Sequence, residues 1–146
     1  MTIHSDMFDE KKKETPTVMV SGGFDPVHAG HIRLIRAAAE HGDVIVIANS
    51  DEWLFRKKGF VFMTFGARAE ILNAIKGVIL VDSVDDADGT VCEAIYRHEP
   101  TYFANGGDRG KSNTPEQSVC EELKVKLLWG VGGDKKLASS SDLVQN

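Results

Sequence analysis

A chain of 146 residues is long enough for one domain with a hydrophobic core and too short for two. Its net charge of -5, with 22 acidic against 17 basic residues, argues against a nucleic-acid-binding protein, because phosphate backbones select a basic surface. No apolar run approaches the roughly 18 residues that a membrane span needs, so no membrane partner is expected.

The predicted elements alternate between strands and helices after a flexible polar tail at 1–15, which lacks the apolar core of a signal peptide. Strands are predicted at 17–21, 43–49, 78–81, 101–104 and 126–129, and helices at about 30–41, 66–76, 90–98 and from Thr114 onward. A polar connection with aromatic anchors is predicted at 50–59. Strands spaced by helices imply a parallel sheet with right-handed crossovers. The predicted fold class is α/β, a Rossmann-like three-layer α/β/α domain at 16–146 with a five-stranded parallel sheet.

Helical spacing identifies the apolar side chains that we expect in the core. In the first helix these are Ile32, Ile35, Ala38 and Ala39, whereas Arg33 and Arg36 lie off the stripe. In the second helix they are Ala69, Ile71, Leu72 and Ile75. Four aromatic side chains before the second helix are expected in the core, with an apolar patch for a homodimer as the alternative: Trp53, Phe55, Phe60 and Phe62.

The two cysteines are predicted to be unpaired and not to bind metal. Cys92 and Cys120 stand 28 positions apart, and neither belongs to a C-x-x-C pair, which disfavours a zinc site. We interpret Cys92 as a small core residue at the start of a helix. A reducing, cytoplasmic location is therefore expected.

The most informative stretch is 21–31, Ser-Gly-Gly-Phe-Asp-Pro-Val-His-Ala-Gly-His, which joins the first strand to the first helix. Backbone N–H groups in a tight turn and at a helix start lack partners, and the helix dipole favours an anion there. His28 and His31 are spaced i, i+3 and can present both rings on one side of the helix start. Two solvated histidines on a plain turn are the alternative, but the surrounding glycines favour phosphate binding. Asp25 is interpreted as a turn-stabilising residue.

With its other loops included, the chain resembles the cytidylyltransferase-like nucleotidyltransferases, the H-x-G-H superfamily. The resemblance covers about residues 17–144 and rests on five segments in the family's order: 23–31, 49–51, a lysine loop before 68–72, 106–108 and 139–141. Among the subfamilies it is similar to the glycerol-3-phosphate cytidylyltransferases and to the adenylyltransferase half of the ADP-heptose synthases. The Asn-Gly-Gly-Asp string at 105–108 is closer to the latter.

The resemblance implies an EC 2.7.7 nucleotidyltransferase that moves CMP or AMP from CTP or ATP onto a small phosphate ester. Glycerol 3-phosphate or a sugar phosphate would accept the nucleotide, and pyrophosphate would leave. Mg²⁺ would be held mainly by the triphosphate, not by protein ligands. A homodimer is a further expectation. The alternative is a catalytically silent, nucleotide-binding regulatory domain of the same fold.

The resemblance also implies a role for each matching residue. The expected catalytic residues are His28, His31 and Lys58. The expected nucleotide-binding residues are Gly22, Gly23, Phe24, Gly107, Asp108, Ser139, Ser140 and Ser141. An acceptor or phosphate would be bound by Arg68, whose alternative is a surface helix arginine, and by Lys57, which competes with its neighbour for the loop-lysine role.

Other nucleotide-binding motifs fit the chain less well. The string at 107–112 imitates the end of a P-loop, but Asn105 stands where that motif needs glycine. The segment at 136–140 is a poor match to the second signature of class I aminoacyl-tRNA synthetases. One departure from the resemblance is Asp134, which stands where the cytidylyltransferase branch has an arginine, so Lys135 or Lys136 would have to substitute.

Overall fold

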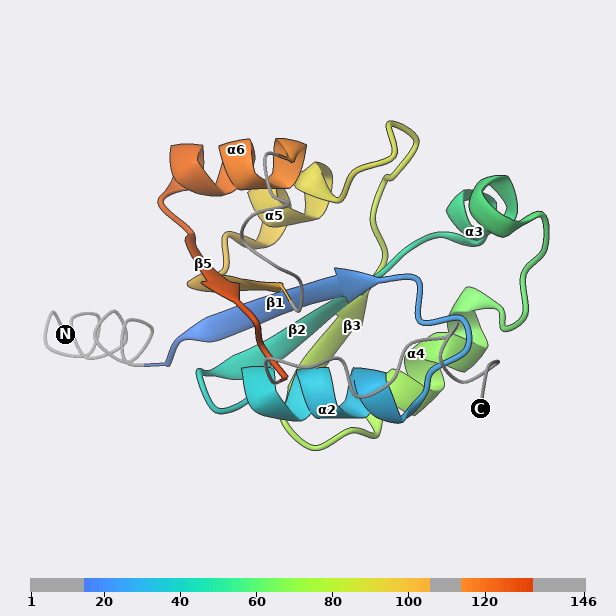
Figure 1. Cartoon of the computed structure of the whole chain (residues 1–146), viewed down its shortest axis with the longest axis horizontal. Helices are drawn as coiled ribbons and strands as arrows, with labels where there is room; N and C mark the ends of the chain where they lie inside the picture. Colours follow the sequence, from blue (N-terminus) through green and yellow to red (C-terminus); the bar gives the residue numbers. More distant parts are fainter. Residues whose placement is uncertain (1–14, 106–113, 133–146) are drawn as a thin grey trace, which may run out of the picture.

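All strands of the sheet run parallel, in the order β3-β2-β1-β4-β5, in the computed structural model, which describes residues 15–105 and 114–132 (Figure 1). The strands are β1 (Thr17–Gly22), β2 (Asp43–Ala48), β3 (Val78–Asp82), β4 (Tyr102–Asn105) and β5 (Lys126–Trp129). The predicted α/β class with a five-stranded parallel sheet is confirmed. The strand order reverses between β1 and β4. Ligands of such sheets bind beyond the carboxyl ends of the strands at this reversal.

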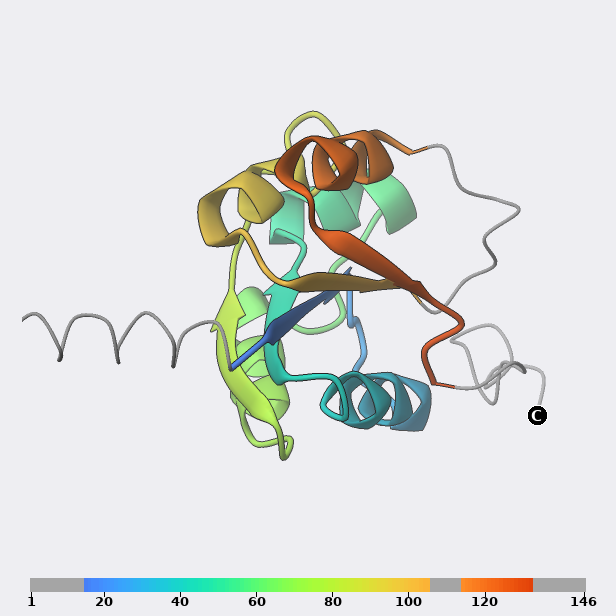
Figure 2. The ribbon, with the colours of Figure 1, turned by 90° about the vertical axis from the view of Figure 1, so that its left-hand side faces the viewer.

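Helices cover both faces of the sheet (Figure 2). One face carries α5 (Cys92–His98) and α6 (Pro115–Leu123), and the other carries α2 (Ala29–Ala38) and α4 (Phe65–Asn73). The side chains of β2 alternate between the two faces, so Val44 and Val46 join one buried cluster while Ile45 and Ile47 join the other. This double burial explains the continuous apolar run of β2.

The segment that was predicted to be a polar connection is in fact a helix, α3 (Asp51–Lys58). The Ser50 side chain caps its N-terminus by accepting the Trp53 N–H at 3.0 Å, and Gly59 ends it in the left-handed conformation, with φ of 86°. Leu54 is its one buried residue, so α3 has no apolar stripe. Caps and charges specify this helix, and a prediction based on apolar periodicity therefore missed it.

Three aromatic side chains that were expected in the core lie at the surface instead. Phe55, Phe60 and Phe62 are 61%, 54% and 66% exposed. Their segment extends beyond the carboxyl ends of the strands, away from the helices that cover the sheet within the described residues (Figure 1). The predicted core position is therefore wrong for these three residues.

The apolar stripes of α2 and α4 are narrower than predicted. Ile35 and Ala38 of α2 and Leu72 of α4 are fully buried, whereas Ile32 and Ile71 are 39% and 42% exposed. Ile32 belongs to the first turn of α2, directly after the loop that follows β1. The residues Arg33 and Arg36 are exposed, as predicted.

Several sequence-based expectations meet the structure only in part. Cys120 is buried and Cys92 is half-buried, and both thiols are free.

The predicted tail at 1–15 falls almost entirely outside the described residues. No helix in the described part of the chain is long and apolar enough to cross a lipid bilayer.

Candidate active site

The two histidines of the H-x-G-H motif stack on each other at the N-terminus of α2. Their ring centroids lie 3.8 Å apart with planes 19° from parallel. The Nδ1 atom of His28 accepts the N–H of Gly30 at 3.0 Å, and Nδ1 of His31 accepts the N–H of His28 at 3.1 Å. The pair thus forms a reciprocal capping box in which imidazoles replace the usual hydroxyl and carboxylate.

This capping fixes the tautomer of each neutral ring. A nitrogen that accepts a hydrogen bond carries no proton, so a neutral His28 or His31 carries its proton on Nε2. Burial, and to a lesser extent the electrostatic influence of His28, together lower the pKa of His31 to about 4. His31 is therefore a neutral Nε2–H donor at physiological pH. Phe24 lies edge-on to this ring, with centroids 4.9 Å apart.

The turn before the histidines packs closely against another helix at its glycine. A Cβ atom on Gly23 would lie only 3.0 Å from the side chain of Leu54 in α3. Phe24 follows with a positive φ of 54° and is 3% exposed. Gly22, Gly23 and Phe24 therefore form a close-packed turn at the carboxyl end of β1, next to the predicted phosphate site.

The carboxylate of Asp25 connects this turn to the segment after α3. Its side chain is 1% exposed and forms an ion pair with Lys58, with 2.8 Å between Oδ2 and Nζ. The backbone N–H groups of Phe62 and Met63 donate to the same carboxylate at 2.8 and 2.5 Å. Burial alone would raise the pKa of Asp25, but the Lys58 contact and the two amides together lower it. The interpretation of Asp25 as a turn-stabilising residue agrees with this geometry.

Arg68 of α4 is fully buried and donates only to protein oxygens among the described residues. Its Nη1 donates to the carbonyl oxygens of Gly23 and Asn49, at 2.8 Å each, and its Nε to that of Met63 at 3.0 Å. Its Nη2 pairs with the carboxylate of Asp51 at 2.6 Å. The alternative of a surface helix arginine is therefore wrong. The contact of Arg68 with a phosphate or acceptor stays a prediction.

The loop after β3 supports the end of β2 through Asp86. The buried carboxylate of Asp86 accepts hydrogen bonds from Asn49 Nδ2 at 3.0 Å, Ser50 N at 2.8 Å and Ser50 Oγ at 2.7 Å. Burial would raise its pKa, but the donors on Ser50 and Asn49 lower it. Sequence reasoning did not identify Asp86, because it is one of several acidic residues in a loop without a motif.

The predicted loop lysines point to different partners. The ammonium of Lys58 binds the carbonyl and the carboxylate of Asp25, both at 2.8 Å. The exposed Lys57 instead lies over the ring of Trp53, 5.3 Å from its centroid. The two lysines are adjacent on the last turn of α3, yet their side chains have different partners.

The predicted residues Gly107, Asp108, Ser139, Ser140 and Ser141 lie outside the described residues.

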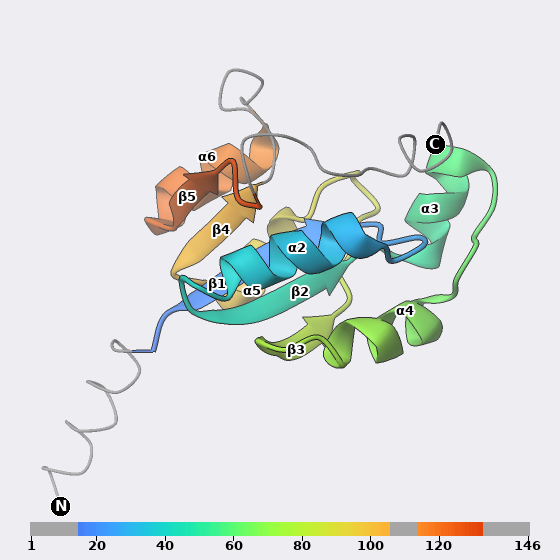
Figure 3. The same ribbon diagram turned by 60° about the horizontal axis from the view of Figure 1, so that its bottom comes forward.

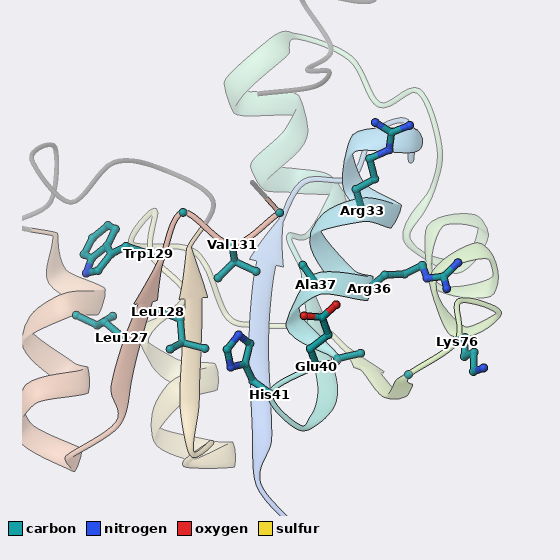
Figure 4. A pocket seen from close by; sticks show the side chains of 14 residues that line it. Arg33, Arg36, Ala37, Glu40, His41, Lys76, Leu127, Leu128, Trp129 and Val131 are labelled. Atoms are coloured by element: carbon teal, nitrogen blue, oxygen red, sulfur yellow. The ribbon is translucent and has the colours of Figure 1, made fainter. Parts of the chain in front are cut away.

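The motif residues gather at one end of the molecule, away from an open groove on the described part of the chain. Figure 3 shows α3, α4 and the N-terminal end of α2 at the carboxyl ends of β1 and β2. The groove, of about 1180 Å³, instead runs between the C-terminal half of α2 and β5 (Figure 4). Its lining includes His41, Leu128 and Val131 but neither motif histidine. We therefore place the candidate active site at the histidine turn.

Curated relatives share this chain's sequence over most of its length. It is 37% identical over 114 residues to the bifunctional protein HldE of Gluconobacter oxydans (strain 621H), covering 76% of this chain and 23% of that protein. It is also 37% identical over 113 residues to the FAD synthase of Pyrococcus horikoshii, covering 75% of this chain and 70% of the synthase. The chain thus spans about a quarter of the length of HldE.

A solved structure and a family model agree with these relatives. A lipopolysaccharide core biosynthesis protein from Thermoplasma volcanium superimposes with a TM-score of 0.63 at 21% identity, covering 78% of this chain and 94% of that one, which supports the fold. The cytidylyltransferase-like family model matches residues 19–145. The resemblance that the sequence motifs predicted is confirmed, and the chain belongs to the cytidylyltransferase-like family of nucleotidyltransferases.

Proposed function

We propose that this chain transfers AMP from ATP to a small phosphate monoester and releases pyrophosphate. The observation that carries the proposal is the capped histidine pair at the head of α2. Both Nδ1 atoms are occupied by backbone N–H groups, so the neutral rings of His28 and His31 offer Nε2–H donors at a helix N-terminus. Such a site suits a triphosphate, whose charge the helix dipole also favours.

In the proposed reaction, an oxygen of the acceptor phosphate attacks the α-phosphorus of ATP. A new P–O bond forms while the bond from that phosphorus to the bridging oxygen breaks, and pyrophosphate carries away the electron pair. An ionised phosphate needs no general base, so the protein contributes positioning and charge stabilisation. The Nε2–H groups of His28 and His31 would donate to the oxygens that gain charge as the bond breaks.

The choice of ATP over CTP is supported by two kinds of relative. HldE is an ADP-heptose synthase and the archaeal relative is a FAD synthase, and both named products contain an adenylate group. The string at 105–108 also resembles the heptose branch. The acceptor class is any small phosphate monoester, including the sugar phosphates and FMN that those products imply.

Magnesium would enter as a complex with the triphosphate. No cluster of three or more His, Cys, Asp or Glu side chains that could hold a metal ion is found among residues 15–105 and 114–132. The carboxylate within the turn itself, Asp25, already binds Lys58 and two backbone amides. A triphosphate-bound Mg²⁺ fits these residues because its ligands are phosphate oxygens and water, and it would neutralise charge on the leaving pyrophosphate.

The remaining predicted residues are assigned to the same reaction. Lys57 is exposed at the end of α3, so we assign it to the acceptor phosphate. Lys58 would provide positive charge beside the turn while it stays paired with Asp25. The glycine and aspartate at 107–108 would contact the nucleoside, and the serines at 139–141 the β and γ phosphates.

The test is pyrophosphate release with each of ATP, CTP, GTP and UTP, combined with FMN, a hexose 1-phosphate or glycerol 3-phosphate. We expect release only when ATP and an acceptor are both present. A variant with His28→Ala and His31→Ala together is the control for contaminating activity. Turnover with CTP but not ATP would contradict the choice of base. ATP binding without turnover on any acceptor would favour the catalytically silent regulatory domain.

A further inference from the structure

The phosphate turn, residues 22–28, is closed by a ring of hydrogen bonds through two buried, oppositely charged side chains. Arg68 Nη1 donates to the carbonyl oxygen of Gly23 at 2.8 Å, and its Nε donates to that of Met63 at 3.0 Å. The N–H of Met63 donates in turn to Oδ1 of Asp25 at 2.5 Å. Asp25 follows Gly23 by two residues, so the turn itself completes the ring.

Burial separates both side chains from any ligand in solvent. Arg68 is 0% exposed, and the side chain of Asp25 is 1% exposed. The guanidinium also holds the carbonyl oxygen of Asn49 at 2.8 Å and the carboxylate of Asp51 at 2.6 Å. All three of its nitrogens are therefore directed at protein oxygens. The planar guanidinium fixes its acceptors relative to one another, which a lysine ammonium cannot do.

The ring connects segments that are distant in sequence. Met63 precedes α4, Asn49 follows β2, and Gly23 follows β1. Both backbone polar groups of Met63 are held, its N–H by the carboxylate of Asp25 and its carbonyl oxygen by the guanidinium of Arg68. Hydrogen bonds to charged groups are stronger than neutral ones. The two charged side chains therefore fix the same residue from opposite sides without a direct ion pair.

We propose that Arg68 and Asp25 are a coupled pair of positioning residues that set the conformation of the phosphate turn, and that neither binds substrate. This inference rests on the proposed nucleotidyl transfer for its kinetic consequence, and it replaces the acceptor contact that the resemblance implies for Arg68. The turn carries the backbone amides and the histidine donors that would meet the triphosphate. A displacement of the order of 1 Å at such a site costs about a hundredfold in rate.

A double-mutant cycle with Arg68→Lys and Asp25→Asn tests the coupling. Each single variant should lower kcat by about tenfold or more, with KM for ATP and for the acceptor within about threefold of the original value. The double variant should be about as slow as the slower single variant, since either change already opens the ring. Arg97→Lys is the matched control, because Arg97 also forms several bonds, to Glu93, Asp82 and Ser83, but on α5.

Hydrogen–deuterium exchange provides a second measurement that does not depend on turnover. Amides of residues 22–28 should exchange faster in both single variants than in the original chain, while those of β2 should not change. Arg97→Lys should leave both segments unaltered. If the original chain shows no transferase activity, this result still decides the positioning role separately from the proposed function.

Three results would overturn the proposal. The first is additive loss of kcat in the double variant, which would mean that the two side chains act independently. The second is a raised KM for the acceptor at constant kcat in Arg68→Lys, which would mean direct binding of the acceptor. The third is unchanged exchange of the turn in either single variant.

Discussion

Nδ1 of His31 accepts the backbone N–H of His28 at 3.1 Å, so one ring both caps α2 and faces the proposed triphosphate. The cap and the Nε2–H donor can be tested separately, because an asparagine oxygen can replace Nδ1 and a glutamine amide can replace Nε2–H. His31→Asn should keep the helix cap and lower kcat by about a hundredfold or more, because the donor is lost.

His31→Gln should instead retain more of the activity than His31→Asn. The measurement is kcat in the pyrophosphate assay together with the free energy of unfolding in urea. The cap contributes about 1 kcal/mol, so His31→Ala should lose stability by roughly that amount and His31→Asn by less. Equal kcat values for His31→Asn and the original chain would remove His31 from the mechanism.

Lys58→Ala should destabilise the protein by about 2 kcal/mol, because it leaves the buried Asp25 carboxylate without its cation. Lys57→Ala is the matched control: it removes the same charge one residue away, where the side chain is exposed and lies over a ring face. It should change the free energy of unfolding by less than about 0.5 kcal/mol. Urea denaturation of both variants at pH 7 checks the difference.

The same two variants should separate in kinetics. Lys57→Ala should raise KM for the acceptor phosphate, whereas Lys58→Ala should lower kcat because the turn shifts. If Lys58→Ala were as stable as the original chain, the ion pair with Asp25 would not hold the turn.

The sheet and its histidine turn could be predicted from the sequence because their signals are local. Apolar runs identify the strands, and the string at 21–31 carries the glycines and both histidines of the turn. The role of Arg68 could not be predicted in this way. A lone arginine on a helix has the same sequence appearance whether it faces solvent or, as here, four acceptors from three other segments.

The helix α3 was not predicted, although the signals for it are local in the sequence. Its signals were present in the sequence as a serine cap, two acidic residues in the first turn, three basic residues in the last and a terminal glycine. They were outweighed by the missing apolar stripe, because Leu54 is the one buried residue of α3. The side chains of Phe55, Phe60 and Phe62 are exposed because their segment lies beyond the sheet. Amino-acid composition does not reveal that position.

Ser50→Ala should be more costly than an ordinary cap deletion. The Ser50 hydroxyl accepts the N–H of Trp53 and donates to the buried Asp86 at 2.7 Å, so its loss removes a cap and a partner of a buried carboxylate. We expect a loss of about 2 kcal/mol in the free energy of unfolding. Thr64→Ala is the matched control, since Thr64 caps α4 at an exposed site with a longer contact of 3.4 Å. Similar losses for both variants in urea denaturation would contradict the role of Asp86.

Stability should depend on pH between about 4 and 6.5 through His31. Its pKa is lowered from 6.5 to about 4 in the folded protein, chiefly by burial and further by the electrostatic influence of His28. Within this window the unfolded chain binds a proton at His31 that the folded chain excludes, so the free energy of unfolding falls as the pH falls. Above pH 6.5 His31 is neutral in both the folded and the unfolded chain, so it no longer makes the free energy of unfolding depend on pH. One such proton gives a slope of at most about 1.4 kcal/mol per pH unit.

The measurement is urea denaturation of the original chain and of His31→Gln at half-unit steps from pH 4 to pH 8. The difference between the two curves isolates His31 from the other titrating groups. That difference should be flat above pH 6.5 and should change in favour of His31→Gln as the pH falls toward 4. The pKa values of Asp25 and Asp86 are lowered from 3.8, so their contributions fall only toward the acid end of this window, and the difference between the two curves cancels them. Parallel curves over the whole range would mean that the His31 ring is protonated as readily in the folded as in the unfolded chain, and its assignment as a neutral Nε2–H donor would then be wrong.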